Sequence, residues 1–347
     1  MSDPPISQRK LDHLRVSLEE DVQSKEIGAG FNRYSFIHNA LPEMNLTDVD
    51  LSVTALGKKL RAPLIISSMT GGTEPAWGIN RNLAEAAQSV GIGLALGSER
   101  AAIEHPSLVY TYRVRDLAPD VLLLANLGAI QLNNGFGPKE CIKAVENMDA
   151  DGLVLHLNPL QECLQGGGNT NFRGLLSKIS ELARVLPVPI MVKEVGWGIS
   201  YNVAQRLIEA GVKAIDTAGA GGTSWSEVEK HLASGEVQRT IAEDFATWGI
   251  PTVDSILACR RAAPDTLIVG SGGIRTGIDA AKAIALGADM VGMGRPLLRP
   301  ATVSGSAVEE RVRRFLEELR IAMFCLGARN LEQLRKAEMR NPSQPAV

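Results

Sequence analysis

Short apolar runs and amphipathic stretches alternate along most of the chain. The apolar runs lie at residues 63–69, 91–96, 121–126, 152–157, 188–193, 213–217, 267–270 and 288–293. Helical periodicity occupies residues 77–90, 139–148, 175–186, 200–210, 252–262, 276–286 and, as the final outer helix, 311–326. Runs that are apolar on both faces and alternate with helices predict a parallel sheet in an α/β fold. Eight such units predict a closed (β/α)8 TIM barrel, because doubly wound sheets rarely need eight consecutive units.

A single barrel domain is expected to take up the whole chain, residues 1–347, with an N-terminal extension over residues 1–60. Residues 31–54 predict an irregular lead-in with one or two short strands. The first eight residues and residues 336–347 have the composition of flexible tails.

Three further segments fall outside the regular alternation. Arg9, Lys10 and His13 would share one face of a helical turn, but composition alone favours a solvated basic tail. The insertion after the sixth run, residues 219–250, combines a glycine-rich turn with charged helical pieces and is expected to shape the mouth of the barrel. The glycine-rich loop 165–170 predicts either a lid or a tolerated surface insertion.

Composition and charge limit the class of partner. The chain has 347 residues, of which 45% are hydrophobic, enough for a substantial core. A net charge of −3 offers no basic field for nucleic acid, and no uncharged apolar run is long enough to cross a bilayer. A polar N-terminus that contains prolines is not a signal peptide, and four widely spaced cysteines form no disulfide or metal framework. A cytoplasmic location is therefore expected.

Two glycine turns near the C-terminus predict a phosphate site. Gly272-Gly273-Ile274-Arg275 follows the seventh apolar run, and Gly294-Arg295 follows the eighth. Glycine lets backbone N–H groups approach an anion, and the following helix start adds a positive dipole end. Barrels often build their phosphate site from the loops after the last two strands. Tight turns alone would explain the glycines but not the arginine after each of them.

Polar side chains end the predicted strands, where a barrel carries its catalytic groups. They are Ser67, Ser68, Met69 and Thr70; Ser98, Glu99 and Arg100; Asn126; His156, Asn158, Gln161 and Glu162; Lys193 and Glu194; Thr217 and Thr223. Any one of them could be a satisfied core group, but their recurrence on every strand predicts an active site.

Lys193 is open to two interpretations. It could be a Schiff-base nucleophile, as in barrel aldolases, or a cation beside the pyrimidine edge of a flavin. Asn126 and Thr70 suit hydrogen bonds to the same edge. Together with the phosphate site, this arrangement favours FMN, whose single phosphate needs one such cradle.

A second cluster contains His156, Gln161 and Glu162. Mg²⁺ is normally held by one or two carboxylates and by substrate phosphates, so Glu162 is a candidate metal ligand. His156 is either a hydrogen-bonded core group or a functional one. Trp225 and Glu229 would share a helical face in the insertion, as an ordinary amphipathic pair or as part of the site.

These motifs together resemble the type 2 isopentenyl-diphosphate isomerases, which are FMN-dependent barrels. The matching segments are Arg9-Lys10 with His13, Ser68-Met69-Thr70-Gly71-Gly72, Ser98-Glu99-Arg100, Ala125-Asn126-Leu127-Gly128, residues 156–162, Val192-Lys193-Glu194-Val195-Gly196, Gly221-Gly222-Thr223-Ser224-Trp225, Gly272-Gly273-Ile274-Arg275 and Gly294-Arg295. They span nearly the whole chain in order. Ala218 and Gly294 depart from the family pattern, which often has Ser and Ala there.

The resemblance implies a role for each matching residue. FMN would contact Ser67, Ser68, Met69, Thr70, Ser98, Asn126, Lys193 and Thr223, with its phosphate end at Gly273, Ile274, Arg275, Gly294 and Arg295. Substrate would contact Arg9, Lys10, His13, Ser98, Glu99, Arg100, His156, Asn158 and Gln161. Glu162 would bind Mg²⁺, and the catalytic residues would be Gln161, His156, Glu229 and Trp225.

The implied activity is the interconversion of isopentenyl and dimethylallyl diphosphate by a 1,3-allylic proton shift. It would use reduced FMN, with NADPH as its reductant and Mg²⁺ as its metal, and involve no net redox change. A homo-oligomer, tetramer or octamer, is also implied. Three alternatives stay open: an FMN-dependent oxidoreductase, a Schiff-base aldolase and a non-catalytic flavin- or phosphate-binding protein. Hydroxy-acid oxidases need a His base and paired arginines near the flavin, which cannot be placed in this sequence.

Overall fold

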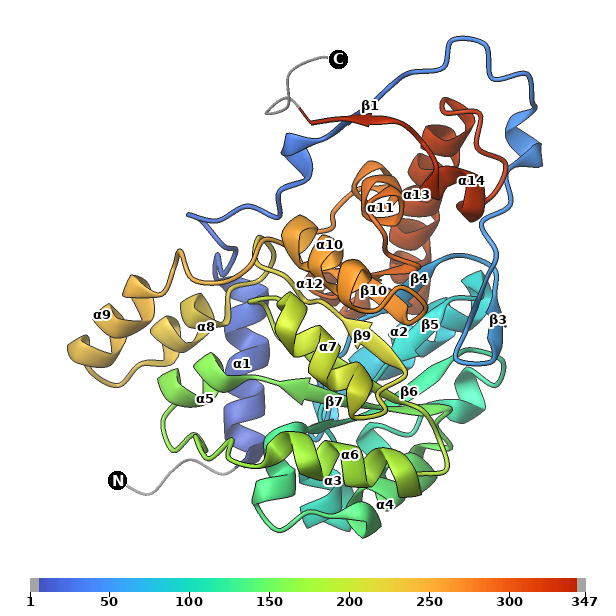
Figure 1. The fold of residues 1–347 in the computed structure, drawn as a ribbon. Helices are drawn as coiled ribbons and strands as arrows, with labels where there is room; N and C mark the ends of the chain where they lie inside the picture. The colour runs from blue at the N-terminus through green and yellow to red at the C-terminus, as the bar shows by residue number, and fades with distance from the viewer. Residues whose placement is uncertain (1–5, 342–347) are drawn as a thin grey trace.

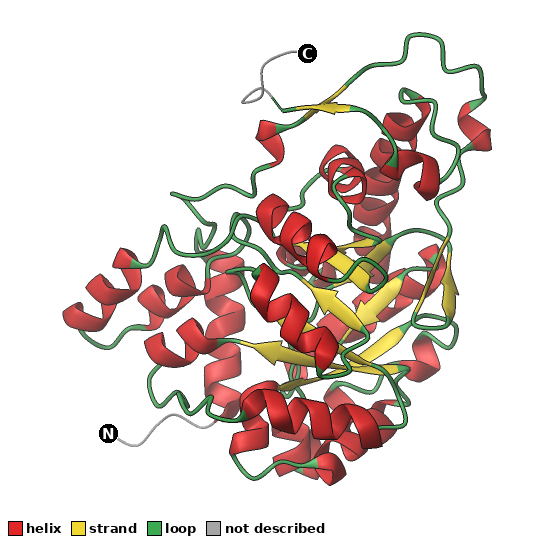
Figure 2. Cartoon of the chain, in the orientation of Figure 1, coloured by secondary structure: helices red, strands yellow, loops and turns green. Residues whose placement is uncertain are grey.

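A closed barrel of eight parallel strands forms the centre of the molecule, with helices around it (Figures 1 and 2). The computed structural model describes residues 6–341. The barrel strands are β4 (Leu64–Ile66), β5 (Gly93–Ala95), β6 (Leu123–Gly128), β7 (Gly152–Leu157), β8 (Ile190–Glu194), β9 (Ala214–Asp216), β10 (Leu267–Ser271) and β11 (Met290–Met293). Each strand overlaps one predicted apolar run. The predicted TIM barrel is therefore confirmed.

Helices fill the connections between the strands, as the periodicity predicted. The long ones are α2 (Glu74–Val90), α4 (Pro138–Met148), α6 (Leu175–Val185), α7 (Tyr201–Glu209), α10 (Thr252–Ala262), α11 (Gly277–Ala285) and α13 (Gly305–Phe324). Shorter ones are α3 (Arg100–Glu104), α5 (Pro159–Leu164), α12 (Arg295–Ala301) and α14 (Leu331–Arg335). Their starts follow capping chemistry: the Thr276 hydroxyl accepts from Asp279 N at 3.1 Å, and the Asp279 carboxylate accepts from Thr276 N in return. Across residues 6–341, no helix is both long and apolar enough to span a membrane.

Alternation along the strands gives the barrel interior two different layers. Ile65, Leu124, Val154, Met191 and Val269 belong to one buried apolar cluster and come from five different strands. Burying a side chain of this kind contributes roughly 1.5–3 kcal/mol. Because side chains two residues apart on a strand point to the same face, the next inward layer consists of the residues two positions further along. Those residues are polar: Ser67, Asn126, His156, Lys193 and Ser271.

The N-terminal segment is not the basic tail that composition favoured. Residues 6–19 form helix α1 (Ile6–Glu19), which contacts α8 (Trp225–Leu232) and α12. Val16 of α1 is 2% exposed and packs with Val22 and Val228. Residues 6–8 are therefore helical rather than disordered, and the rest of the predicted tail, residues 1–5, lies outside the described residues.

The extension between α1 and the barrel is mostly irregular, with two short strand pairs. Strands β2 (Val53–Ala55) and β3 (Lys58–Leu60) form an antiparallel hairpin. Strand β1 (Ser35–Phe36) pairs with β12 (Met339–Arg340) near the C-terminus. The chain just after residue 336 is thus tied to the extension rather than being a free tail, and residues 342–347 lie outside the described part.

The insertion after β9 folds into helices α8 and α9 (Glu236–Asp244). Figure 1 shows both helices standing out from the barrel on the side where α1 and α5 lie. Contacts of α8 with both α1 and α5 place the insertion at the same end of the barrel as the N-terminal helix.

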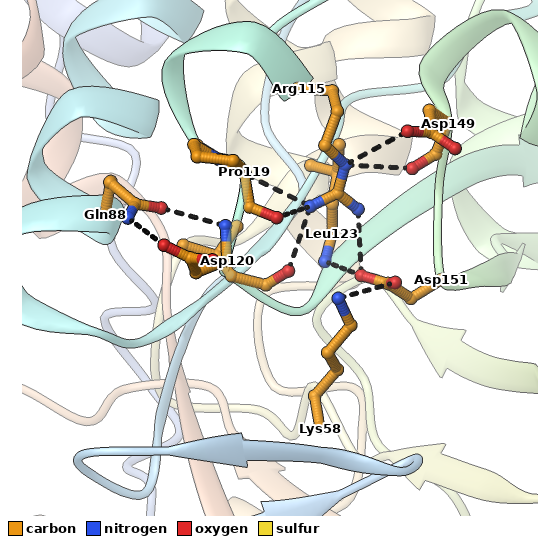
Figure 3. A network of polar contacts seen from close by, with 10 residues as sticks. Lys58, Gln88, Arg115, Pro119, Asp120, Leu123, Asp149 and Asp151 are labelled. Atoms are coloured by element: carbon orange, nitrogen blue, oxygen red, sulfur yellow. Dashed lines mark hydrogen bonds and ion pairs between the residues drawn. The ribbon is translucent and has the colours of Figure 1, made fainter.

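An arginine clamp joins strands β6 and β7 at their N-terminal ends (Figure 3). Arg115 donates to the carbonyls of Ala118, Pro119, Val121 and Asp149 at 3.0–3.2 Å. Its remaining nitrogen donates to Asp151 Oδ2 at 2.9 Å, and the same oxygen accepts from Leu123 N at 2.9 Å. Lys58 of the β2–β3 hairpin pairs with the other carboxylate oxygen at 3.1 Å. One aspartate therefore holds the starts of two strands and the hairpin together.

The same clamp recurs between β10 and β11. Arg260 donates to the carbonyls of Ala263, Pro264, Thr266 and Gly287 and to Asp289 Oδ2, which also accepts from Ile268 N. Residues 115–123, RDLAPDVLL, and residues 260–268, RRAAPDTLI, place these groups at identical spacing. In the ring of strands, β6 and β10 lie four positions apart, so the two clamps face each other across the barrel. The chain thus contains an internal structural repeat half a barrel apart.

Candidate functional site

A cavity of about 860 Å³ opens at the C-terminal ends of the barrel strands. Its floor is the polar layer of the barrel, and its far end is formed within residues 271–275 and 292–299. One wall comes from α1, between Lys10 and Glu19, and from the residues that follow it. Ligand pockets typically enclose roughly 300–1,000 Å³, so this cavity has room for a cofactor together with a small substrate.

The structure brings most of the predicted site residues to this one cavity. Its lining includes Lys10, His13, Ser67, Ser68, Met69, Thr70, Ser98, Asn126, His156, Gln161, Lys193, Thr223, Trp225, Gly273, Ile274, Arg275, Gly294 and Arg295. Six predicted residues do not line it: Arg9, Glu99, Arg100, Asn158, Glu162 and Glu229.

The polar layer is bound together by hydrogen bonds between strands. Asn126 Nδ2 donates to Ser68 Oγ at 2.8 Å, and Asn126 Oδ1 lies 2.9 Å from His156 Nδ1. Lys193 Nζ donates to the carbonyl of Glu194 at 2.6 Å. Burial lowers the pKa of His156 to about 3, assisted by the positive charges of Lys193 and Lys10. His156 is therefore neutral near pH 7 and, with its Nδ1–H donated to Asn126, presents Nε2 as an acceptor.

The Gly272–Gly273 turn at the far end has a left-handed backbone, which suits an anion cradle. Gly272 and Gly273 have φ of +103° and +71°, a region that L-residues rarely occupy, and a Cβ on Gly273 would meet the backbone of Gly221. Arg275 donates to Gln23 Oε1 at 2.5 Å, and Arg295 donates to the carbonyls of Ser17 and Glu20 at 3.1 and 2.8 Å. Each guanidinium has five N–H donors, so both keep donors beyond these bonds.

Ser67 supplies an independent sign that the cavity accommodates a polar group. Its hydroxyl is buried and has no hydrogen-bond partner among the described residues. A buried hydroxyl without a partner is costly, roughly 1–3 kcal/mol, and a ligand in the adjoining cavity would satisfy it.

A chain of hydrogen bonds connects α1, the insertion and α5 beside the cavity. Glu229 Oε1 lies 3.1 Å from His13 Nε2 and accepts from Gln161 Nε2 at 3.3 Å. Asn158 Nδ2 donates to Gln161 Oε1 at 3.2 Å and to Glu162 Oε1 at 2.9 Å. Glu229 therefore lies directly behind Gln161, although the two residues are far apart in the sequence. The His13 ring also meets Trp225 edge-on, with ring centroids 5.2 Å apart.

The predicted residues outside the lining have other partners. Arg100 Nε pairs with Glu104 at 2.8 Å, and Arg9 reaches the carbonyl of Gly166 at 3.5 Å. Glu162 Oε2 accepts from Asn169 N at 2.6 Å, which fastens the loop 165–170 at one point. Across residues 6–341, no group of three or more His, Cys, Asp or Glu side chains has the arrangement of a metal site. A metal at Glu162 would therefore take most of its oxygens from a ligand.

Sequence reasoning missed two polar side chains of the barrel interior. Asp216 lies 2.5 Å from Ser271 Oγ and accepts from Ala218 N at 3.2 Å, which supports the unusual φ of +36° at Ala218. Burial raises the pKa of Asp216, against the nearby charge of Lys193. The alternation along the strands could have identified both residues. Asp216 lies two positions after the inward Ala214, and Ser271 lies two positions after Val269, as Lys193 does after Met191.

Known proteins resemble this chain in sequence. The profile of the FMN-dependent dehydrogenase family matches residues 133–341. An isopentenyl-diphosphate delta-isomerase of Nostoc sp. is 51% identical over 94% of this chain and 93% of its own. One of Rickettsia bellii is 48% identical over 96% of this chain and 97% of its own. One of Rickettsia felis is 50% identical over 96% of each chain.

Solved structures show a similar fold. An (S)-mandelate dehydrogenase aligns with a TM-score of 0.69 over 96% of each chain at 17% identity. A mandelate oxidase variant crystallised with an FMN adduct aligns with a TM-score of 0.61 over 98% of this chain and 94% of its own at 15% identity. At such identities the likeness concerns the fold alone. The near-full-length identity to the curated relatives decides the family: this chain belongs to the isopentenyl-diphosphate delta-isomerases, in their FMN-dependent, type 2 branch.

Proposed function

We propose that this protein interconverts isopentenyl diphosphate and dimethylallyl diphosphate by a 1,3-allylic proton shift, with reduced FMN and Mg²⁺ and no net redox change. The observation that carries the proposal is one cavity: two glycine turns with Arg275 and Arg295 line one end of it, and its wall contains the Gln161 side chain backed by Glu229. The names of the relatives supply the substrate.

The residues of the cavity fit FMN. The cradle of Gly273 and Gly294, with Arg275 and Arg295, would hold its phosphate, and Lys193 would stand as a cation at the polar layer. Ser67, Ser68, Met69, Thr70, Ser98, Asn126 and Thr223 would complete its contacts. When bound, reduced FMN supplies an electron-rich ring that stabilises positive charge next to it. NADPH is the proposed reductant.

The cavity mouth fits a diphosphate. Lys10 lines the mouth, and Arg9 lies on the preceding position of the same helix. Glu162 would hold Mg²⁺ together with substrate oxygens, because a lone carboxylate plus phosphates is a normal site for this metal. Charge neutralisation by these groups would anchor the diphosphate arm and leave the five-carbon tail in the cavity.

Gln161 and Glu229 are the proposed route for the proton. Gln161 alone is a poor acid, but its amide is bonded to Glu229, a carboxylate that is 5% exposed. Glu229 would take or supply the proton through this contact, with His13 on its other side holding it in place. Trp225 would shield the site from water. His156, neutral and fixed by Asn126, would contact the substrate as an uncharged group rather than act as an acid.

The decisive experiment is NMR of the product formed from isopentenyl diphosphate with FMN, Mg²⁺ and NADPH. We expect dimethylallyl diphosphate, formed only with reduced flavin and with far less than one NADPH consumed per turnover. One NADPH consumed per turnover, or an undiminished rate with oxidised flavin, would move the protein to the oxidoreductase alternative. If the purified protein binds no flavin, the Schiff-base aldolase becomes the favoured alternative. We also propose a homo-oligomer, tetramer or octamer, from the family resemblance, and a cytoplasmic location, from the widely spaced cysteines.

A further inference from the structure

The ammonium group of Lys10 is held at the cavity mouth by a tyrosine that does not line the cavity. Lys10 Nζ donates to the Ser98 carbonyl at 2.7 Å and to the Tyr112 hydroxyl. The Tyr112 hydroxyl in turn donates to the same Ser98 carbonyl at 2.8 Å. Lys10 also lies 5.0 Å from the centroid of the Tyr112 ring. Tyr112 therefore contacts Lys10 by both its hydroxyl and its ring.

Tyr112 is tightly packed. Its side chain is fully buried, and a Cβ on Gly71 would overlap its ring. The neighbouring Thr111 Oγ1 accepts from Gly72 N at 2.9 Å, and Asn80 Nδ2 donates to the Thr111 carbonyl at 2.9 Å. The glycine pair after the first barrel strand thus makes room for the tyrosine.

A buried carboxylate lies beneath this contact. Glu99 is 0% exposed, its Oε1 accepts from Asn126 N at 3.0 Å, and its Oε2 has no partner among the described residues. Burial raises the pKa of Glu99. Burial lowers the pKa of Lys10, and the negative charge of Glu99 partly offsets this lowering. Glu99 does not line the cavity, and its side chain is hydrogen-bonded to the backbone of Asn126.

We propose that Tyr112 is a positioning residue for anion binding: its hydroxyl aims the Lys10 ammonium into the cavity mouth, where it binds the diphosphate group of the ligand. The proposal rests on the proposed function for the identity of the ligand. Tyr112 touches α1 at Lys10 and the barrel at Ser98, so it also fastens the N-terminal helix over the mouth.

Tyr112→Phe tests this role, with Tyr110→Phe as its matched control. Phenylalanine keeps the buried ring and its packing on Gly71, so only the hydroxyl is removed. Tyr110 is two residues away and exposed, and its hydroxyl bonds Glu74 rather than α1. Inorganic pyrophosphate with Mg²⁺ is titrated into the FMN-loaded protein by calorimetry. We expect Tyr112→Phe to weaken pyrophosphate binding about tenfold, the scale of one hydrogen bond to a charged group, and Tyr110→Phe to leave it unchanged.

Two further measurements separate positioning from general stability. FMN affinity should be equal in wild type and Tyr112→Phe, and the KM for isopentenyl diphosphate should rise while kcat holds. Lys10→Met should lose as much pyrophosphate affinity as Tyr112→Phe, and the double variant should lose no more than Lys10→Met.

Three results would overturn the proposal. The first is equal pyrophosphate affinity in Tyr112→Phe and wild type. The second is a loss of FMN affinity in Tyr112→Phe that parallels its loss of pyrophosphate affinity. The third is a double variant in which the two losses of pyrophosphate affinity add. Failure of the proposed function gives a different result, namely wild-type protein that binds pyrophosphate but does not isomerise isopentenyl diphosphate. That result would refute the proposed reaction, and the pyrophosphate affinities of wild type and Tyr112→Phe would still test the role of Tyr112.

Discussion

Asp151 offers the sharpest test of how this barrel is held together, because its carboxylate serves three partners at once. Replacing it with alanine removes the acceptor for Arg115 and for Leu123 N, both at 2.9 Å, and the ion pair with Lys58 at 3.1 Å. The change touches only the N-terminal end of the barrel, far from the cavity. We therefore expect an effect on stability without an effect on ligand binding.

The structure sets the size of the effect. A hydrogen bond to a charged group contributes about 1.5–3 kcal/mol, and an orphaned buried N–H costs about 1–3 kcal/mol. Arg115 is 12% and Asp151 20% exposed, so water can partly replace the lost partners, and the pair with the 36% exposed Lys58 adds little. The four backbone carbonyls that still hold Arg115 reduce the loss further. We expect a loss of about 3 kcal/mol of unfolding free energy.

Asp149→Asn is the matched control. Asp149 also faces Arg115, but at 3.9 Å and with 87% of its side chain exposed, so its charge should contribute less than about 1 kcal/mol. Asparagine tolerates the φ of +48° at this position, which alanine would not. Thermal unfolding of the FMN-free proteins, followed by circular dichroism, should show a midpoint about 4 °C lower for Asp151→Ala and nearly unchanged for Asp149→Asn.

The second clamp supplies an internal replicate. Asp289 accepts from Arg260 and Ile268 N as Asp151 does from Arg115 and Leu123 N, and Arg335 takes the place of Lys58. Asp289→Ala should cost a similar amount, and the double variant should show the sum, because the clamps share no partner. A midpoint for Asp151→Ala that matches Asp149→Asn would refute the reasoning.

Three further predictions concern the cavity. Lys193→Ala should weaken FMN binding or lower the flavin midpoint potential, since a cation stabilises the reduced ring; unchanged affinity and potential by fluorescence and redox titration would contradict this. Glu162→Gln should sharply raise the Mg²⁺ concentration needed for activity while FMN stays bound, and overlaying metal titrations would exclude Glu162 as the ligand. Removing residues 1–13 should raise KM or abolish turnover with the barrel still folded by circular dichroism; full activity would mean that Lys10 and His13 are dispensable.

The barrel and most of its polar mouth could be predicted from sequence because both follow local periodicity. Each strand is an apolar run, and its inward side chains turn polar near its C-terminal end, as at Met191 and Lys193. Side chains on a strand point to the same face at every second residue, so an inward position can be assigned from the strand alone, without knowing which residues pack against it. The same rule would have found Asp216.

The N-terminal helix could not be placed by the same reasoning. An isolated 14-residue helix with mostly polar residues is marginal in water, so its composition resembled that of a tail. It is stabilised by contacts that no local pattern reveals, such as Val16 on Val228 and the bonds from Arg295 to the carbonyls of Ser17 and Glu20. The contact of Glu229 with Gln161 could not be predicted from a local pattern either, because it joins the insertion to α5.

The two ends of the barrel differ in role. The arginine clamp is repeated at the N-terminal ends of the strands and stabilises the barrel, whereas the C-terminal ends, which line the cavity, do not repeat. At the N-terminal ends, β6 and β10 carry the same arginine, the same Ala-Pro-Asp turn and the same aspartate partner. At the C-terminal ends the two strands diverge: β6 carries Asn126, bonded to Ser68 and His156, whereas β10 runs into the left-handed Gly272–Gly273 turn. Fastening the strand starts fixes their register without using any group at the mouth. The loops at the other end are then free to differ, and the proposed division needs this freedom: the phosphate would lie on the β10 side and the reacting part of the ligand on the β6 side.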